Sequence, residues 1–169
     1  MAFTHLRCHS NFSLLSGGST LDELLDAAQA HGMDSLALTD TNGLFAAVPF
    51  QRKAREREIR PLFGAVLTAS LERGAPGADA LVLARDRAGF AAVSRLVTAR
   101  RLESDFSLPA ALTAEAVRAA GSIFVLSADS GLLRELAATL PAGMLYAELC
   151  HDGAEGAAAR LRNTVALAA

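Results

Sequence analysis

The stretch FTHLRCHSNFSLLSGGST, from Phe3 to Thr20, decides how this chain folds, because it predicts a strand, a turn and a helix start in succession. His5, Arg7 and His9 occupy alternate positions in it. Successive side chains of a strand point to opposite faces, so a strand here would place these three on one face. The opposite face would hold Leu6 and Cys8.

The rest of the chain alternates short apolar runs with amphipathic segments. Thr20 and Glu23 have the spacing of a capping box at the start of a helix, and Gly32 is typical of its end. Further strands are predicted for SLALTD, IRPLFGAVL, DALVLA, SIFVLS and MLYAEL. Further helices are predicted for GLFAAVPFQRKARERE (with Pro49 as a possible break), DRAGFAAVSRLVTARRL, TAEAVRAA, GLLRELAATL and AEGAAARLRNTVALAA. RRLESDFSLPAALT is the least patterned connection and is expected to be a loop.

This alternation predicts an α/β fold with parallel strands and helices packed outside them. In such folds ligands bind at the carboxyl ends of the strands. The residues expected at those ends are His9, Asp40, Val66, Ser127 and His151.

The composition excludes several classes of protein. The 169 residues suffice for one domain, and no stretch rich in Pro, Gly or Ser divides them. A net charge of −2 gives no electrostatic case for direct nucleic-acid binding. The basic run QRKAREREIR is interrupted by glutamates, as expected for a solvated helix face with i, i+4 ion pairs. Cys8 and Cys150 show no zinc-ligand spacing, no apolar run is long enough to span a membrane, and a cytoplasmic location is expected.

Arg7 argues against a metal site on the first strand. Two imidazoles at alternate positions would suit zinc or manganese. A guanidinium between them has no lone pair for a metal and repels a divalent cation. Asp40, in LTDTNGL at the end of the next predicted strand, is a natural partner for it. We expect Arg7 and Asp40 to form an ion pair in place of metal–ligand bonds.

The segment HLRCHSNFSLLSGGSTLDELLDAAQAHGMDSLALTDTNGLFAAVPF resembles the opening of the PHP (polymerase and histidinol phosphatase) domain. It is most similar to the form found at the N-terminus of bacterial C-family DNA polymerase III α subunits and their error-prone relatives. The likeness continues more loosely through IRPLFGAVL, DALVLARDRAGFAAVSRLVTARRL, SIFVLSADSGLLRELAATL and YAELCHDG. The resemblance implies a distorted parallel (β/α) barrel, which in active members holds a metal cluster that hydrolyses phosphate esters.

Most positions that bind metal in that family carry other residues here. In the family's His-x-His pair the first position is Arg7 and the second, His9, is kept. Of its Thr-Asp-His, Asp40 is kept and the histidine is Thr41. The glutamate of its Gly-x-Glu is Val66. The former metal site, as the resemblance implies it, comprises Arg7, His9, Ser16, Asp40, Thr41, Val66, Asp79 and Asp129.

These losses predict a degenerate site that needs no metal and has no catalytic residues. The resemblance then implies a non-catalytic structural or docking module in DNA replication or translesion synthesis. Its expected partners are the remainder of a polymerase α subunit and a proofreading exonuclease subunit. The alternative is a metal-dependent phosphoesterase or exonuclease with zinc or manganese in a reduced site. The ligands of that site would be His9, Asp40 and His151.

The family's last ligands, an Asp-x-His pair, would lie beyond Ala169, so residues 1–169 are expected to form a single PHP domain that lacks the C-terminal part of the barrel. The predicted strands number fewer than the family's barrel needs to close. An unpaired sheet edge tends to aggregate or to find a partner. We therefore expect a partner strand, a helix that covers the edge, or marginal stability.

Overall fold

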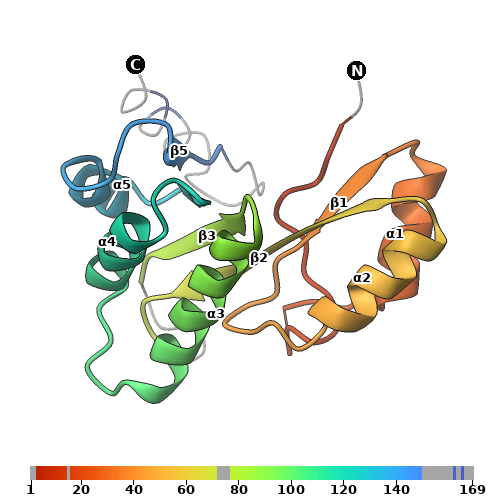
Figure 1. The fold of residues 1–169 in the computed structure, drawn as a ribbon, viewed down its shortest axis with the longest axis horizontal. Helices are drawn as coiled ribbons and strands as arrows, with labels where there is room; N and C mark the ends of the chain where they lie inside the picture. The colour runs from red at the N-terminus through yellow and green to blue at the C-terminus, as the bar shows by residue number, and fades with distance from the viewer. Residues whose placement is uncertain (1–2, 15, 72–76, 150–161, 163–164, 166–169) are drawn as a thin grey trace. The chain divides into compact units, whose positions relative to one another are not determined.

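The computed structural model describes residues 3–14, 16–71, 77–149, 162 and 165. They belong to two compact units, Met1–Val66 (the N-terminal unit) and Leu67–Ala169 (the C-terminal unit), and strand β2 runs across the boundary (Figure 1). The strands follow the order β1-β2-β3-β4-β5. A mixed, mostly parallel α/β sheet of this kind confirms the predicted fold class, an incomplete (β/α) barrel, with one departure described below.

The helices and strands alternate as predicted. The N-terminal unit contains α1 (Leu21–Ala30), β1 (Ser35–Leu38), α2 (Ala47–Glu56) and most of β2 (Arg60–Thr68). The C-terminal unit contains β3 (Asp79–Ala84), α3 (Arg87–Leu102), α4 (Leu108–Arg118), β4 (Ile123–Ser127), α5 (Ser130–Ala137) and β5 (Leu145–Ala147).

The capping box starts α1 as the sequence predicts. The backbone N–H of Glu23 donates to Thr20 Oγ1 at 3.3 Å, and Glu23 Oε2 accepts from the Thr20 N–H at 2.7 Å. Both bonds satisfy N–H groups that a helix start leaves without partners. At the other end Gly32 has a φ of +66°, which glycine adopts at little cost, so the helix ends there.

The second helix contains Pro49 without a break, because the proline lies in the first turn, where its missing N–H is not needed. The sequence suggested that the basic run on this helix forms ion pairs along its own face. Lys53 and Arg57 instead pair with aspartates of α1. Lys53 Nζ lies 2.6 Å from Asp22 Oδ2, and Arg57 lies 2.9 Å from Asp22 and 2.7 Å from Asp26. These ion pairs hold α1 and α2 side by side (Figure 1).

Beneath the ion pairs, α1, β1 and α2 share one apolar core. Leu25, Phe50 and Ala54 are fully buried, and the ring of Phe50 meets that of Phe63 edge to face at 6.0 Å. Burial of each large side chain of this kind stabilises the fold by about 1.5–3 kcal/mol. The remaining buried members of this core are Leu21, Ala28, Leu36, Leu38, Ala46 and Ile59.

The prediction of a first strand in FTHLRC is wrong. Residues 3–10 run beside β1 but are not a strand. The N–H of Ala37 donates to the carbonyl of His5, and the N–H of Thr39 donates to the carbonyl of Cys8. Two residues on one side therefore match three on the other, which is the geometry of a bulge. The bulge ends the predicted alternation: Cys8 packs on the apolar core, whereas Leu6 is exposed.

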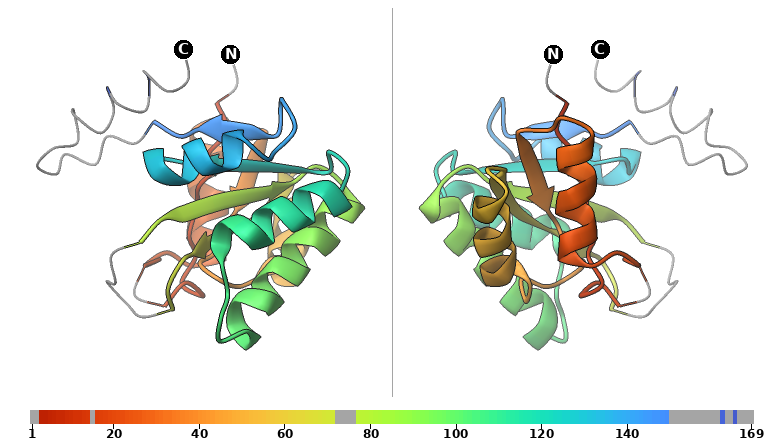
Figure 2. Two further views of the ribbon diagram at one scale, coloured as in Figure 1. Left: turned by 90° about the vertical axis from the view of Figure 1, so that its left-hand side faces the viewer. Right: turned by 90° about the vertical axis from the view of Figure 1, so that its right-hand side faces the viewer.

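The C-terminal unit holds the departure from a parallel sheet. β4 and β5 are parallel, but β3 and β4 are antiparallel, with Val82 opposite Val125. Two helices, α3 and α4, connect β3 to β4 and lie side by side (Figure 2). The first helix, α3, brings the chain back to the end of the sheet where β3 begins, and α4 carries it to the end where β3 finishes. The next strand, β4, therefore runs opposite to β3. The predicted loop at RRLESDFSLPAALT is short, because α4 already starts at Leu108.

The helix predicted for AEGAAARLRNTVALAA lies largely outside the described residues, which include only Arg162 and Val165 of it, both helical. No helix in the described ranges is both long enough and apolar enough to cross a membrane.

Candidate functional site

Asp40 lies just beyond the carboxyl end of β1 and is only 2% exposed. Its Oδ1 accepts hydrogen bonds from the backbone N–H of Ser10 at 2.7 Å and from Ser13 Oγ at 2.7 Å. The hydroxyl of Ser10 lies 3.0 Å from Oδ1 and 2.9 Å from Oδ2. Both oxygens of this buried carboxylate therefore have donors, which is what a buried charge requires.

A tight loop brings both serines to Asp40. Ser13 N–H donates to the Ser10 carbonyl at 2.9 Å, and Asn11 N–H donates to the Ser19 carbonyl at 2.8 Å, which closes the loop before α1. Gly17 is required by this closure. A Cβ on Gly17 would lie 2.0 Å from the Ser10 carbonyl oxygen, so any side chain would push the loop apart.

Thr41 and His9 complete the cluster around Ser13. Thr41 N–H donates to Ser13 Oγ at 2.9 Å, while the Ser13 hydroxyl donates a hydrogen bond to Asp40 Oδ1. His9 Nδ1 lies 3.4 Å from both Ser13 Oγ and Thr41 Oγ1. The hydroxyl of Ser13 thus links the carboxylate, the following backbone and the retained histidine.

Val66 occupies the end of the neighbouring strand. It forms a parallel bridge with Thr41, its N–H donates to the Asp40 carbonyl at 3.2 Å, and its carbonyl accepts from Asn42 N–H at 2.8 Å. Its side chain is buried. The structure therefore brings together four residues of the predicted former metal site: His9, Asp40, Thr41 and Val66.

The predicted ion pair between Arg7 and Asp40 is wrong. Both residues are described, and the contacts of the Asp40 carboxylate are with Ser10 and Ser13. Arg7 instead lines a hollow of about 470 Å³, together with His9 and Ser16, between residues 5–9 and α1. Ser16 is exposed, and its backbone N–H donates to the carbonyl of Ser13.

Sequence reasoning missed the two serines that matter most here. Ser10 and Ser13 are neutral, whereas the negative charge of Asp40 favours a positively charged partner. Hydroxyl and backbone donors satisfy a carboxylate equally well, but only the folded loop shows that they reach it.

The two remaining aspartates of the predicted set lie in the C-terminal unit. Asp79 begins β3, and its backbone carbonyl accepts from Ser127 Oγ at 2.7 Å. Asp129 caps α5, with Oδ1 accepting from the Leu132 N–H at 2.7 Å. A capping role accounts for Asp129 without a ligand. His151 lies outside the described residues.

The electrostatics around Asp40 affect Cys8. Burial raises the pKa of the Cys8 thiol, and the negative charge of Asp40 adds to the rise. A thiol with a raised pKa stays protonated and is a weak nucleophile and metal ligand. Among the residues that the structure describes, no three His, Cys, Asp or Glu side chains are grouped so that they could hold a metal ion.

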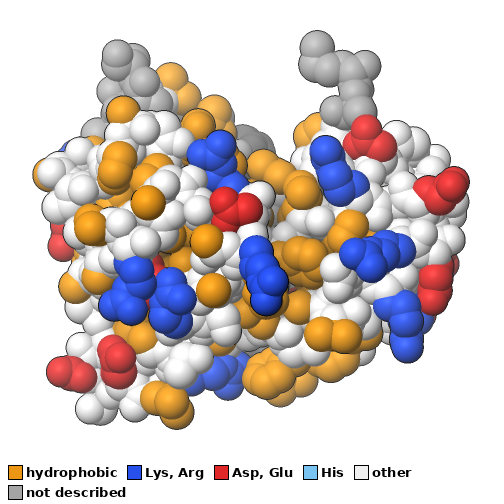
Figure 3. Space-filling model, in the orientation of Figure 1, with side chains coloured by type: hydrophobic (Ala, Val, Ile, Leu, Met, Phe, Trp, Pro, Cys, Tyr) orange, Lys and Arg blue, Asp and Glu red, His pale blue; other side chains and the backbone are white. Residues whose placement is uncertain are grey.

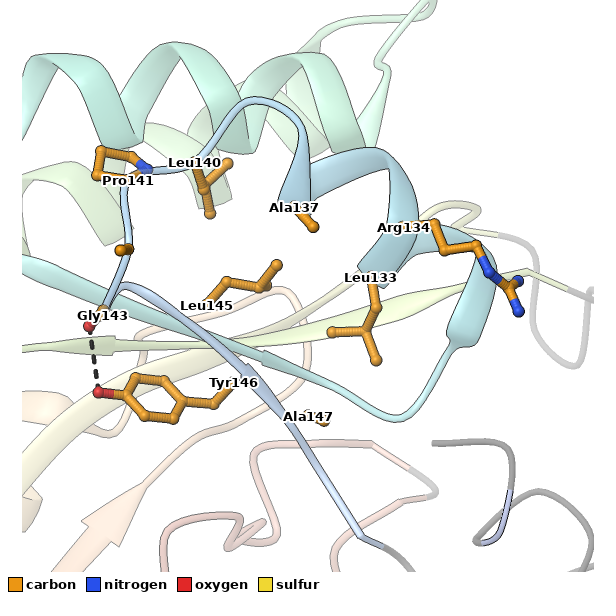
Figure 4. A pocket seen from close by; sticks show the side chains of 10 residues that line it. Leu133, Arg134, Ala137, Leu140, Pro141, Gly143, Leu145, Tyr146 and Ala147 are labelled. Carbon is orange, nitrogen blue, oxygen red and sulfur yellow. Dashed lines mark hydrogen bonds between the residues drawn. The ribbon is translucent and has the colours of Figure 1, made fainter. Parts of the chain in front are cut away.

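A second hollow, of about 460 Å³, lies in the C-terminal unit between α5 and β5 (Figure 4). Leu133, Leu140 and Leu145 give it an apolar lining, Arg134 stands at one end, and the Tyr146 hydroxyl donates to the Gly143 carbonyl at 3.2 Å. Its described lining contains no carboxylate, histidine or thiol, and the hydroxyl of Tyr146 is already engaged with the Gly143 carbonyl.

Comparisons with known proteins agree with the resemblance seen in the sequence. A family model for the PHP domain matches residues 5–165. The error-prone DNA polymerase of Symbiobacterium thermophilum is 49% identical over 102 residues, which are 60% of this chain and 9% of the polymerase. That of Mycobacterium tuberculosis is 43% identical over 107 residues, 60% of this chain and 10% of the polymerase. The chain thus spans about a tenth of the length of the polymerases it matches.

A solved structure shares the fold. It comes from Bifidobacterium adolescentis and is provisionally described as a metal-dependent phosphoesterase. The two structures superpose with a TM-score of 0.58 at 16% sequence identity, over 96% of this chain and 82% of the other.

Proposed function

This chain belongs to the PHP domain family, and from that premise we propose that it is a non-catalytic module of a C-family DNA polymerase. In this proposal residues 1–169 form one PHP domain with an incomplete barrel, and the domain works in replication or translesion synthesis. Hydrogen bonds from Ser10 and Ser13 to Asp40 hold the site together where active relatives use metal ions.

The bonds to Asp40 are the observation that carries the proposal. A divalent ion binds carboxylate oxygens through their lone pairs, and here four donor contacts already face those oxygens. Val66 presents an isopropyl group that cannot bind a metal or act as a base. Among the former site's residues in the N-terminal unit, His9 and Asp40 keep the ligand types of the family, whereas catalytic zinc sites have three protein ligands. The residues present do not fit the family's metal cluster.

The matched relatives support a place in a larger polymerase. They are error-prone DNA polymerases about ten times longer than the region matched. We propose that the module stabilises the polymerase chain to which it is attached or bound, and that a proofreading exonuclease is a further partner. DNA contact is then indirect, and the cytoplasmic location expected from the cysteines stays a prediction.

Hydrolysis assays test this proposal against the phosphoesterase alternative. The full chain and its Asp40→Asn variant are incubated with a chromogenic phosphate ester and with single-stranded DNA, with added manganese or zinc. Circular dichroism checks that both proteins are folded at the assay temperature. We expect both to match the buffer background. Metal-dependent hydrolysis that is lost in Asp40→Asn would establish the enzyme instead.

A further inference from the structure

Arg100 on α3 is buried at a position where a helix normally carries an apolar side chain. It is only 6% exposed, and its Nε has no hydrogen-bond partner among the residues that the structure describes. A helix face against a core is built from small and apolar residues, and the rest of this stripe follows that rule. Its other buried members are Gly89, Ala92, Val93, Leu96 and Val97.

A buried guanidinium is costly unless acceptors surround it, because it cannot lose its proton. Burial accordingly lowers the pKa of Arg100 from its ordinary value. Two contacts compensate in part. The carboxyl end of α3 favours a positive charge, and the centre of the Phe106 ring lies 5.0 Å from Arg100 Cζ. Neither gives Nε an acceptor, and a buried donor left in this state points to an ion or water that belongs there.

The guanidinium points toward the start of α4, which supplies further donors. Phe106 immediately precedes Ser107, the N-cap of α4, and the side chain of Ser107 makes no capping hydrogen bond. The first N–H groups of a helix have no partner within the helix. Pro109 has no N–H, so the donors of this turn are the backbone groups of Leu108 and Ala110. Arg100 and this turn therefore present positive charge to the same place.

Both elements lie at the end of the sheet where β4 finishes. The helix α3 returns the chain to the end where β3 begins, and β4 finishes at that end because it is antiparallel to β3. The hydroxyl of Ser127, at the end of β4, donates to the carbonyl of Asp79, at the start of β3. In α/β folds ligands bind beyond the carboxyl ends of strands, and helix N-termini at that end attract anions.

We propose that Arg100 and the first turn of α4 bind a phosphate group, supplied by free phosphate or by a mononucleotide. A phosphate has oxygens on several sides, so it can accept from the guanidinium and from helix N–H groups together. A water molecule would satisfy Nε but would not balance the charge. The inference goes beyond the proposed function and does not depend on it, since the Asp40 cluster belongs to the N-terminal unit.

A small anion fits this place better than a nucleic-acid strand does. Figure 3 shows the Lys and Arg side chains of one face in small separate groups, with Asp and Glu side chains among them. A strand of nucleic acid needs a continuous basic surface, whereas one phosphate needs a single cation and a few N–H groups. The connection from α3 to α4 also carries two exposed acids, Glu103 and Asp105. Their charges oppose an anion, so we expect a Kd of about 1 mM.

An NMR titration of the isotope-labelled full chain tests the proposal. The titrants are sodium phosphate, adenosine monophosphate and, at the same ionic strength, sodium chloride. We expect the amide signals of Leu108 and Ala110 to shift and saturate with a phosphate titrant and to stay in place with chloride. The titrant that saturates at the lower concentration identifies the source of the phosphate group. No saturable shift at these amides with either phosphate titrant would overturn the proposal.

Variants of Arg100 connect the binding to this side chain. Arg100→Met keeps an unbranched apolar stem without the charge, and it should weaken phosphate binding by at least about tenfold. Arg100→Lys keeps the charge without the planar fork, and it should bind with an intermediate affinity. Arg87→Met is the matched control, because Arg87 is the exposed first residue of α3, and it should bind within about twofold of the wild type. Equal loss in Arg87→Met, or wild-type affinity in Arg100→Met, would contradict the assignment.

Thermal unfolding gives a second measurement and checks that the variants fold. A ligand that binds only the folded state raises the unfolding midpoint, so phosphate at about twenty times its Kd should raise that of the wild type and leave that of Arg100→Met unchanged. Without phosphate, Arg100→Met should be at least as stable as the wild type, because an apolar side chain replaces an unbalanced buried charge. An equal rise in both proteins would place the phosphate elsewhere and overturn the proposal.

Discussion

Ser10 and Asp40 lie 30 residues apart in the sequence, and the backbone N–H and the hydroxyl of Ser10 both donate to the Asp40 carboxylate. This one residue pair fastens the N-terminal loop to the end of β1. In a metal-binding relative the ion would join ligands from different strand ends. Here hydrogen bonds make the connection, so Asp40 is expected to matter for stability.

Asp40→Asn should lower the free energy of unfolding by about 2–3 kcal/mol. The amide NH₂ that replaces one oxygen would face the donors of Ser10 and Ser13, and a buried donor without an acceptor costs about 1–3 kcal/mol. Urea unfolding of the full chain measures the change. Asp105→Asn is the control, because Asp105 is exposed, and it should stay within about 0.5 kcal/mol of the wild type. Equal stability of the two variants would mean that the bonds to Asp40 contribute little.

Gly17→Ala should destabilise the chain by about 1–3 kcal/mol, because the added Cβ would lie 2.0 Å from the Ser10 carbonyl oxygen. Its neighbour provides a matched control, since a Cβ on Gly18 meets nothing within 4 Å. Thermal unfolding of both variants checks the prediction. If Gly18→Ala is as damaging as Gly17→Ala, the close approach of the loop to Ser10 is not the cause.

Val66→Glu restores the carboxylate that the family carries at this position, and it should destabilise the chain. Val66 is buried, so burial would raise the pKa of the new carboxyl group. An uncompensated carboxylate at this position costs several kcal/mol in unfolding free energy. Manganese or zinc should not recover the loss, because the oxygens of Asp40 already accept hydrogen bonds from Ser10 and Ser13. Arg7 and Thr41 also stand where the family has histidine ligands. Thermal unfolding with and without each metal gives the answer, and a rise in midpoint with metal would argue that the site still binds ions.

Acid should weaken the contact between α1 and α2. The hydrogen bond from Lys53, helped by the charges of Lys53 and Arg57, holds the pKa of Asp22 below its ordinary value of 3.8. A carboxyl whose pKa is lower in the folded state stabilises the fold above about pH 4, and this contribution is lost as the pH falls through the folded value. Asp22→Asn should therefore flatten the decline of unfolding free energy below that pH. Asp105→Asn should leave the slope unchanged, and a flattening of the same size there would remove the assignment to Asp22.

The strands and helices could be predicted because their signals are local. The capping box of Thr20 and Glu23 and the apolar runs of β1 to β5 appear where the patterns place them. The antiparallel β3–β4 pair could also have been foreseen, since the sequence predicts two helices between these strands. What was lacking was the step from two helices to a reversed strand.

The conformation of residues 3–10 could not be predicted from the sequence. Alternation of His5, Arg7 and His9 predicts a strand, but the extra residue at Leu6-Arg7 interrupts the pairing with β1. Such a bulge depends on long-range register and leaves no local pattern. The partners of Asp40 could not be predicted for a similar reason. Its negative charge favours Arg7 as a partner, but the loop fixed by Gly17 places Ser10 and Ser13 against the carboxylate.

The central claim is that serine donors have taken the place of metal ions at Asp40. The most direct test is elemental analysis of the full chain after equilibrium dialysis against manganese or zinc, with Asp40→Asn measured in parallel. The account predicts bound metal well below one ion per chain, and the same amount in the variant. One or more ions per chain in the wild type, lost in Asp40→Asn, would contradict it.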